Sequence, residues 1–383
     1  MKKKSLLILF IVCVVFCVLG LISLKKKSSQ WNDNTQISGK VIEEFPLNDI
    51  TKIILRNSEK SAKITKKDGI WCVSERNDYL ADFEKIRTIL KKFYELKITE
   101  KIVVGPSQYA RLELLTPDKQ HNTGTIAEFY KNGSAIPVAS VLLGKEHKKK
   151  GGDTNPMFGG MGGGSWPDGR YLKVDEQILL VADPLREVVT DSSDWLNKDF
   201  VEIKKIKSVV VLHQKEEESW TLSRYDEKAD WKLDNLSEKK KLKDSEAKTI
   251  GRAFSSASFN DVILDAKTVK TALNKPTKVT IETLDGFVYN IAIGNVDNKY
   301  YLTIDTALEL PEKPKPDENA KEEDVKKDDK QWEEKIAALK EKLDKEKKFN
   351  QWTYEVSNWT VKPLIKKRSE LLEDKVDKKK KEK

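Results

Sequence analysis

The sequence predicts an α+β protein: an N-terminal transmembrane helix followed by two diverged tandem repeats of mostly antiparallel sheet plus helix, each with an insertion. Three observations lead to this prediction. An uncharged apolar run occupies residues 6–24, hairpin-like patterns then stand beside helix-like ones, and the same series of patterns occurs twice. Hairpins next to a helix are typical of α+β folds with mostly antiparallel sheets.

Residues 1–27 are predicted to form a signal anchor. The run at residues 6–24 is uncharged and has three lysines on each side, Lys2–Lys4 and Lys25–Lys27. A helix of about 19 residues rises about 28 Å, close to the roughly 30 Å hydrocarbon core of a bilayer. Apolar residues continue past Gly20, so the pattern favours an uncleaved anchor over a cleaved signal peptide.

The same segment predicts the location. The flanking lysines nearly balance under the positive-inside rule, and the α-amino group favours a cytoplasmic N-terminus. We expect a single-pass protein of the cytoplasmic membrane that contacts membrane lipid through residues 6–24. A linker at residues 28–44 would then lead to an extracytoplasmic C-terminal part.

The positive charge is confined to the two ends of the chain. Of the formal net charge of +9, residues 1–27 supply six and the basic tail at residues 378–383 supplies four. Subtracting both leaves residues 28–377 at −1. Binding to a phosphate backbone needs a clustered basic surface, so we expect no nucleic-acid partner.

Two copies of one pattern fill the body of the chain. Ile50–Leu55 resembles Ile206–Val211, and each of these strands leads through a second strand to a tryptophan-containing strand. A helix follows in each copy, as an apolar stripe over residues 83–96 and a weaker one from Ser245 to Ala257. The later matches are Leu114–Pro117 with Leu273–Pro276, the turn Asn132-Gly133 with Asp285-Gly286, and Gly144 with Gly294.

We expect both repeats to be interrupted at the same point. The first repeat covers residues 45–200 and contains an insertion at 145–169 that is rich in lysine and glycine. The second covers residues 201–377 and contains an insertion at 310–348 that is first proline-rich and then highly charged. In both, a strand would resume after the insertion.

Several landmarks together resemble a bacterial family known as domain of unknown function 4340. They are Asp68-Gly69-Ile70-Trp71, Gln108–Leu114 with Pro117, Leu142–Lys145, and Asp194-Trp195-Leu196. The resemblance implies a membrane-anchored protein on the outer face of the cytoplasmic membrane. It also implies association with ABC-type export systems similar to gliding-motility components, and it supplies no catalytic residues.

No catalytic, cofactor or metal site is predicted. The glycines of Gly159–Ser165 lack the lysine and following helix of a phosphate-binding loop, so a flexible surface loop is favoured. The three histidines are scattered, without ligands at metal-binding spacing. No nucleophile elbow or zincin helix occurs.

Apolar residues in the two insertions are the candidates for partner docking. In the first insertion they are Met157, Phe158, Met161 and Trp166. In the second they are Trp332, Ile336, Leu339 and Leu343, which follow Val325 at the spacing of a narrow coiled-coil-like seam. A helix packed on its own domain explains that seam as well as a partner-binding arm does.

Three functional hypotheses remain. The first is a non-catalytic accessory or scaffold protein that docks an envelope protein, with ABC-type transporter components as the implied partner. The second is a cell-wall or glycan-binding module that uses exposed tryptophan and lysine; Trp166 and Trp332 are its candidates, because Trp71, Trp231 and Trp352 are expected in the core. The third is an unrecognised hydrolase built from scattered carboxylates.

Overall fold

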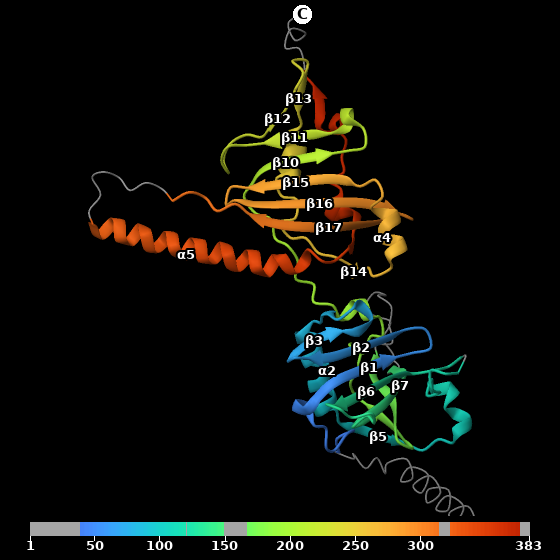
Figure 1. Cartoon of the computed structure of the whole chain (residues 1–383). Helices are drawn as coiled ribbons and strands as arrows, with labels where there is room; N and C mark the ends of the chain where they lie inside the picture. Colours follow the sequence, from blue (N-terminus) through green and yellow to red (C-terminus); the bar gives the residue numbers. More distant parts are fainter. Residues whose placement is uncertain (1–38, 120, 149–166, 314–321, 376–383) are drawn as a thin grey trace, which may run out of the picture. The chain divides into compact units, whose positions relative to one another are not determined.

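The computed structural model describes residues 39–119, 121–148, 167–313 and 322–375, and it is an α+β protein with large antiparallel sheets (Figure 1). The predicted anchor at residues 1–27, the linker up to residue 38 and the basic tail lie outside the described residues. Within the described ranges, no helix combines the length and the apolar character needed to span a bilayer.

Contacts divide the chain into two compact units. Among the described residues, the first contains those within 39–69 and 83–191, and the second contains those within 70–82 and 192–375. The sequence placed one boundary after residue 200 and did not anticipate that residues 70–82 would group with the second half.

The first unit has seven strands and one α-helix. The strands are β1 (Ile50–Arg56), β2 (Ser61–Lys67), β5 (Ile98–Ile102), β6 (Thr125–Lys131), β7 (Ala139–Lys148), β8 (Pro167–Val174) and β9 (Gln177–Val181). The helix is α2 (Phe83–Glu95). Short 3₁₀ turns occupy Leu47–Asp49, Pro106–Gln108 and Ala110–Leu112.

The apolar residues of helix α2 recur at helical spacing and so form one stripe along the helix. This stripe packs against one face of the sheet. It buries Ile86, Ile89, Leu90 and Phe93. The ring of Phe93 lies 4.8 Å from that of Phe129 on β6. The end of the predicted linker packs here too, since Val41 is buried and its N–H donates to the Leu96 carbonyl at 2.9 Å.

The second unit holds the remaining elements. Its strands are β3 (Ile70–Val73), β4 (Tyr79–Leu80), β10 (Ile206–Leu212), β11 (Trp220–Ser223), β12 (Lys232–Leu233), β13 (Lys240–Leu242), β14 (Asp261–Val262), β15 (Thr277–Thr283), β16 (Phe287–Val296), β17 (Lys299–Leu308), β18 (Tyr354–Val356) and β19 (Leu372–Asp374). Its α-helices are α3 (Asp244–Ile250), α4 (Ala266–Ala272), α5 (Glu322–Glu346) and α6 (Asn358–Val361). Its 3₁₀ turns are Ser74–Arg76, Ser192–Trp195, Glu216–Glu218, Lys347–Phe349 and Arg368–Leu371.

An aromatic cluster forms part of the core of the second unit. The Tyr79 ring lies 5.7 Å from Phe259, 5.1 Å from Trp352 and 6.3 Å from Tyr354. Burial raises the pKa of Tyr79 to about 12, because the phenolate would lose its hydration there.

The two units share one strand order. In the first unit the order is β2-β1-β6-β7-β8-β9-β5, and in the second it is β11-β10-β15-β16-β17-β18-β14. Strands at equivalent places in the two sheets also follow one another in the same order along the chain. A helix, α2 or α3, precedes the edge strand, β5 or β14, in each unit. The register also shifts at the same place, between Ile50 and Lys52 on β1 and between Ile206 and Ser208 on β10.

The predicted turns are present. Asp68 and Gly69 have φ values of 48° and 84°, as a tight hairpin turn requires. Gly133 and Gly286, in the next two predicted turns, also have positive φ. Most residues with a β-carbon tolerate such angles poorly, which explains the three glycines; aspartate, as at Asp68, is one of the few that visit this region.

The prediction that both insertions occupy the same point is wrong. The first joins β7 to β8, and the second joins β17 to β18, which is the next connection along the shared order. Strand β17 was missed because its turn, Asp297-Asn298, contains no glycine although both residues have positive φ. Strand pairing also extends into the ends of the first predicted insertion, at Glu146–Lys148 and Pro167–Gly169.

The predicted helix from Ser245 to Ala257 is shorter than expected. Helix α3 ends at Ile250, and turns follow. The Trp231 ring packs so closely on Gly251 that a β-carbon there would lie 2.7 Å from it. Phe254 then adopts φ 60°, which a right-handed helix cannot contain.

Candidate functional site

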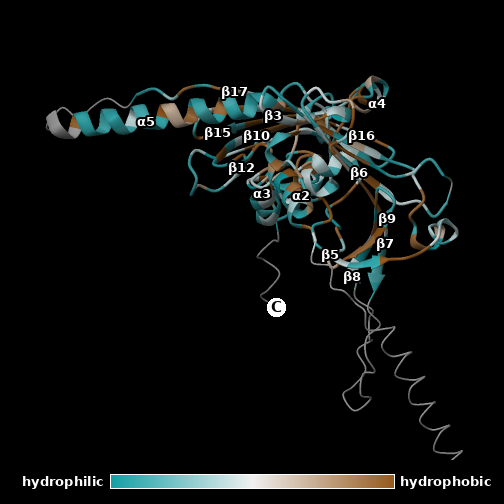
Figure 2. Cartoon of the chain, turned by 90° about the horizontal axis from the view of Figure 1, so that it is seen from below, coloured by the Kyte–Doolittle hydropathy of each residue, from teal (hydrophilic) through white to brown (hydrophobic). Residues whose placement is uncertain are grey.

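Helix α5 is the most extended feature of the second unit. Its C-terminal end contacts β17, and its N-terminal part runs away from the sheet in both views (Figures 1 and 2). The helix is mostly hydrophilic with recurring hydrophobic positions (Figure 2). Its C-terminal end is therefore the part that packs on the sheet, and farther from the sheet the Asp329 carboxylate pairs with Lys313 at 2.9 Å.

A buried carboxylate makes that attachment. Glu346 is 5% exposed, and the Tyr289 hydroxyl donates to it at 2.7 Å. The Lys342 ammonium lies 3.5 Å from the same carboxylate and donates to the Glu202 carbonyl at 2.8 Å. Burial and the Glu346 charge raise the pKa of Tyr289, so the phenol stays protonated and remains a donor.

The predicted docking residues of α5 share one face of the helix. Val325, Trp332, Ile336, Leu339 and Leu343 are all half-buried. The Lys335 ammonium lies 5.5 Å from the centre of the Trp332 ring. The other predicted docking residues, Met157, Phe158, Met161 and Trp166, lie outside the described residues.

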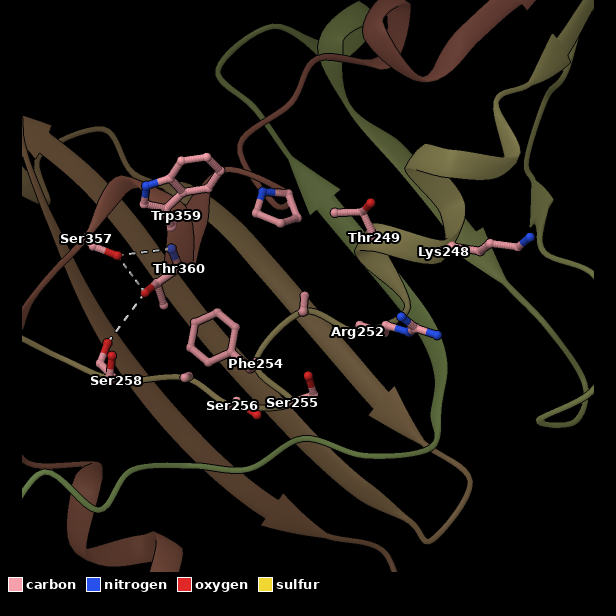
Figure 3. A pocket seen from close by; sticks show the side chains of 13 residues that line it. Lys248, Thr249, Arg252, Phe254, Ser255, Ser256, Ser258, Ser357, Trp359 and Thr360 are labelled. Carbon is pink, nitrogen blue, oxygen red and sulfur yellow. Dashed lines mark hydrogen bonds between the residues drawn. The ribbon is translucent and has the colours of Figure 1, made fainter. Parts of the chain in front are cut away.

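A second candidate site is an open groove of about 490 Å³ between the turn after α3 and helix α6, called here the Trp359 groove (Figure 3). Trp359, Ser357 and Thr360 lie on one side, with Phe254 in the middle (Figure 3). Its lining residues are Lys248, Thr249, Arg252, Ala253, Phe254, Ser255, Ser256, Ala257, Ser258, Ser357, Trp359, Thr360 and Pro363.

Hydrogen bonds fix one wall of the groove. Ser357 caps α6, since its hydroxyl accepts from the Thr360 N–H at 3.4 Å and lies 3.1 Å from the Thr360 hydroxyl. The Thr360 hydroxyl also reaches the Ser258 carbonyl at 3.5 Å. This contact ties α6 to the loop that forms the floor.

The floor contains a strained residue. Phe254 has φ 60°, a conformation that is unusual for a bulky side chain, and it is 4% exposed. Its carbonyl accepts from the Ile203 N–H at 3.0 Å, and its ring lies 6.4 Å from that of Phe200. Packing thus holds the turn that carries Arg252 and the serines.

Sequence reasoning missed this groove. It did not single out Trp359, which is 82% exposed, whereas Trp71 is buried as predicted and Trp231, Trp332 and Trp352 are half-buried. The available signal was Ser357 followed by Asn358-Trp359-Thr360, a capped helix start that presents a tryptophan. Residues far apart in the sequence form the groove, and no local pattern pairs them.

The side chains at the two features determine what each can bind. In the part of the chain that the structure describes, no cluster of three histidine, cysteine or carboxylate side chains could hold a metal ion. The groove lining includes no carboxylate, histidine or cysteine. What the two features can offer is contact surface: an apolar helix face and an aromatic, hydroxyl-rich, cationic groove.

Comparison with known proteins gives one match. The family model described as domain of unknown function (DUF4340) matches residues 71–276, which include the hairpin β3-β4, helix α2 and the second unit as far as Pro276. No curated protein and no solved structure matches. Because the matched segment covers more than half of the sequence, the chain belongs to the DUF4340 family.

Proposed function

We propose that this protein is a membrane-anchored, extracytoplasmic accessory or scaffold protein without catalytic activity, and that α5 docks an envelope protein partner. One observation carries the proposal: α5 is locked to its own unit at Glu346, while the rest of the helix runs away from the sheet and keeps an apolar stripe partly exposed. A helix that served only its own core would bury that stripe.

The architecture supports a scaffold formed by duplication. The shared strand order and the matching register shifts near Ile50 and Ile206 are the expected traces of two diverged tandem copies. The interruptions at β7–β8 and β17–β18 then leave each copy with its own insertion. Insertions between the strands of a regular sheet are typical of sites that contact partners.

The anchor and the partner class complete the proposal. The apolar run at residues 6–24, flanked by lysines, supports one membrane span with the two units outside the cytoplasm. The implied partners are components of an ABC-type export or gliding-motility-like system. Their docking on α5 would bury the Trp332 face against another apolar surface.

The test is crosslinking in intact cells, followed by purification through a C-terminal tag. The disruptive variant combines Trp332→Glu, Ile336→Glu and Leu339→Glu, which places three carboxylates on the apolar face. We expect it to lose the membrane-protein partners captured by the unaltered chain, because each buried charge would be costly at an apolar interface.

The matched control combines Gln331→Glu, Ala337→Glu and Ala338→Glu. It adds the same three charges to exposed positions of the same helix. Capture that persists in the control and is lost in the disruptive variant supports docking on α5. Equal capture by both variants, or a tag that can be labelled only from the cytoplasmic side, contradicts the proposal.

A further inference from the structure

We propose that the Trp359 groove binds an anionic saccharide, a sugar chain that carries carboxylate or phosphate groups. The site involves α3, the turn after it and α6, and none of the α5 residues. It therefore goes beyond the docking function and does not depend on it. The groove has an aromatic, a polar and an electrostatic part.

The aromatic part is Trp359. Its side chain is 82% exposed, whereas Trp195 and Trp220 are only 1% and 3% exposed. The Lys362 ammonium lies 5.5 Å from the centre of its ring. An indole combines a large apolar face with an N–H donor, which suits the C–H face and hydroxyls of a pyranose ring.

The polar part is a row of serines. Ser255, Ser256 and Ser258 line the groove, and within the described ranges none of their hydroxyls has a hydrogen-bond partner in the protein. Each hydroxyl can both donate and accept. Sugar hydroxyls have the same double character, so a serine-lined groove matches them without leaving a donor unpaired.

The electrostatic part comes from Lys248 and Arg252. They are the charged residues of the lining, both are exposed, and in the described part of the chain neither forms an ion pair. The larger cavity in the first unit differs, because its lining mixes Lys40 and Lys101 with Glu43 and Asp175. A guanidinium fork fits carboxylate or phosphate oxygens in pairs, so the Trp359 groove favours a charged sugar over a neutral one.

The groove combines a fixed centre with adjustable cations. Ser357, Thr360 and Ser258 are joined by hydrogen bonds, and Phe254 is held by packing. Lys248 and Arg252 extend outward on the side opposite Trp359 (Figure 3). A saccharide stacked on Trp359 could thus cross the serines and place a charged substituent near Arg252.

The experiment is calorimetric titration of the full chain, purified in detergent, with four probes. Oligogalacturonate supplies rings with carboxylates, and phosphomannan oligosaccharide supplies rings with phosphates. Dextran oligosaccharide supplies rings without charge, and polyphosphate supplies charge without rings. We expect one or both anionic saccharides to bind more tightly than dextran and polyphosphate, and which of the two binds identifies the source of the charge.

Variants assign the binding to the groove. Trp359→Ala should weaken binding of the anionic saccharide about tenfold or more, because stacking area is lost. The double variant Lys248→Ala with Arg252→Ala should abolish the preference over dextran. Neither change should affect folding, since all three side chains are exposed.

Matched controls lie on α5. Trp332→Ala removes a tryptophan outside the groove, and the double variant Lys327→Ala with Lys340→Ala removes two positive charges there; both should leave binding unchanged. The inference is overturned if neither anionic saccharide binds, or if polyphosphate binds as tightly as the saccharides. Unchanged binding by Trp359→Ala would overturn it as well. The α5 triple variant should still bind, which separates this result from a failure of the docking proposal.

Discussion

Gly294 on β16 lies so close to Ala272 that a β-carbon at position 294 would come within 2.6 Å of the Ala272 carbonyl carbon. Gly144 on β7 is the counterpart in the first unit, where a β-carbon would lie 2.7 Å from Leu114. Leu273, next to Ala272, corresponds to Leu114 in the repeated pattern. The same strand therefore uses a glycine to admit the same neighbouring segment in both units, which supports the proposed duplication.

Substituting either glycine tests how tightly these contacts are packed. Gly294→Ala and Gly144→Ala should each lower the free energy of unfolding by about 1–3 kcal/mol, because the facing atoms include backbone and cannot swing aside. Gly105→Ala is the control: a β-carbon there meets nothing within 4 Å, and no change or slight stabilisation is expected. Urea denaturation measures all three. Equal destabilisation in all three variants would contradict the close approach.

Much of the fold could be predicted because its signals are local. The pattern of Ile50–Leu55, the turn Asp68-Gly69 and the α2 stripe each follow from a short stretch of sequence. Strand β17 was missed for a local reason as well, since Asp297-Asn298 forms a hairpin turn without glycine. Because β17 was missed, the second insertion was placed one connection too early in the shared strand order.

The candidate sites depend on contacts that span the sequence, and the sequence shows these poorly. The spacing of Trp332 and Ile336 predicted the α5 face, but the burial of Glu346 depends on Tyr289, far away along the chain. The Trp359 groove needs the turn at Phe254 to lie beside α6. That arrangement results from tertiary packing, so the capped helix start at Ser357 does not by itself mark Trp359 as part of a groove.

The buried end of α5 predicts unequal effects for two lysine–glutamate pairs of one helix. Glu346→Gln should lower the free energy of unfolding by about 2–3 kcal/mol, because a buried, hydrogen-bonded carboxylate is replaced beside Lys342. Glu341, exposed and 2.6 Å from Lys345, is the matched control, and Glu341→Gln should cost far less, because water screens an exposed ion pair. Thermal or urea unfolding gives both values. Similar losses would mean that Glu346 does not lock the helix.

Alkaline pH should weaken the second unit through Tyr79. Its folded-state pKa of about 12 exceeds the ordinary value of 10.0, so the stabilisation is complete below pH 10 and declines as the pH rises toward 12. The full loss is about 2–3 kcal/mol. Urea unfolding across this range should show a smaller decline for Tyr79→Phe than for the unaltered chain. Tyr225, which is 76% exposed, is the control, and Tyr225→Phe should preserve the full decline.

Two buried threonines predict changes of opposite sign. Thr306 is 2% exposed, and its hydroxyl is the buried side-chain polar group that lacks a hydrogen-bond partner within the described ranges. Thr306→Val removes that desolvated hydroxyl while keeping the shape, so we expect stabilisation by about 1 kcal/mol. Thr283 is 5% exposed, but its hydroxyl accepts from the Phe287 N–H at 3.0 Å. Thr283→Val leaves that N–H unpaired and should destabilise by about 1–3 kcal/mol. Unfolding midpoints that fall for both variants would show that the Thr306 hydroxyl has a partner after all, because only a hydroxyl without one can be removed at a gain.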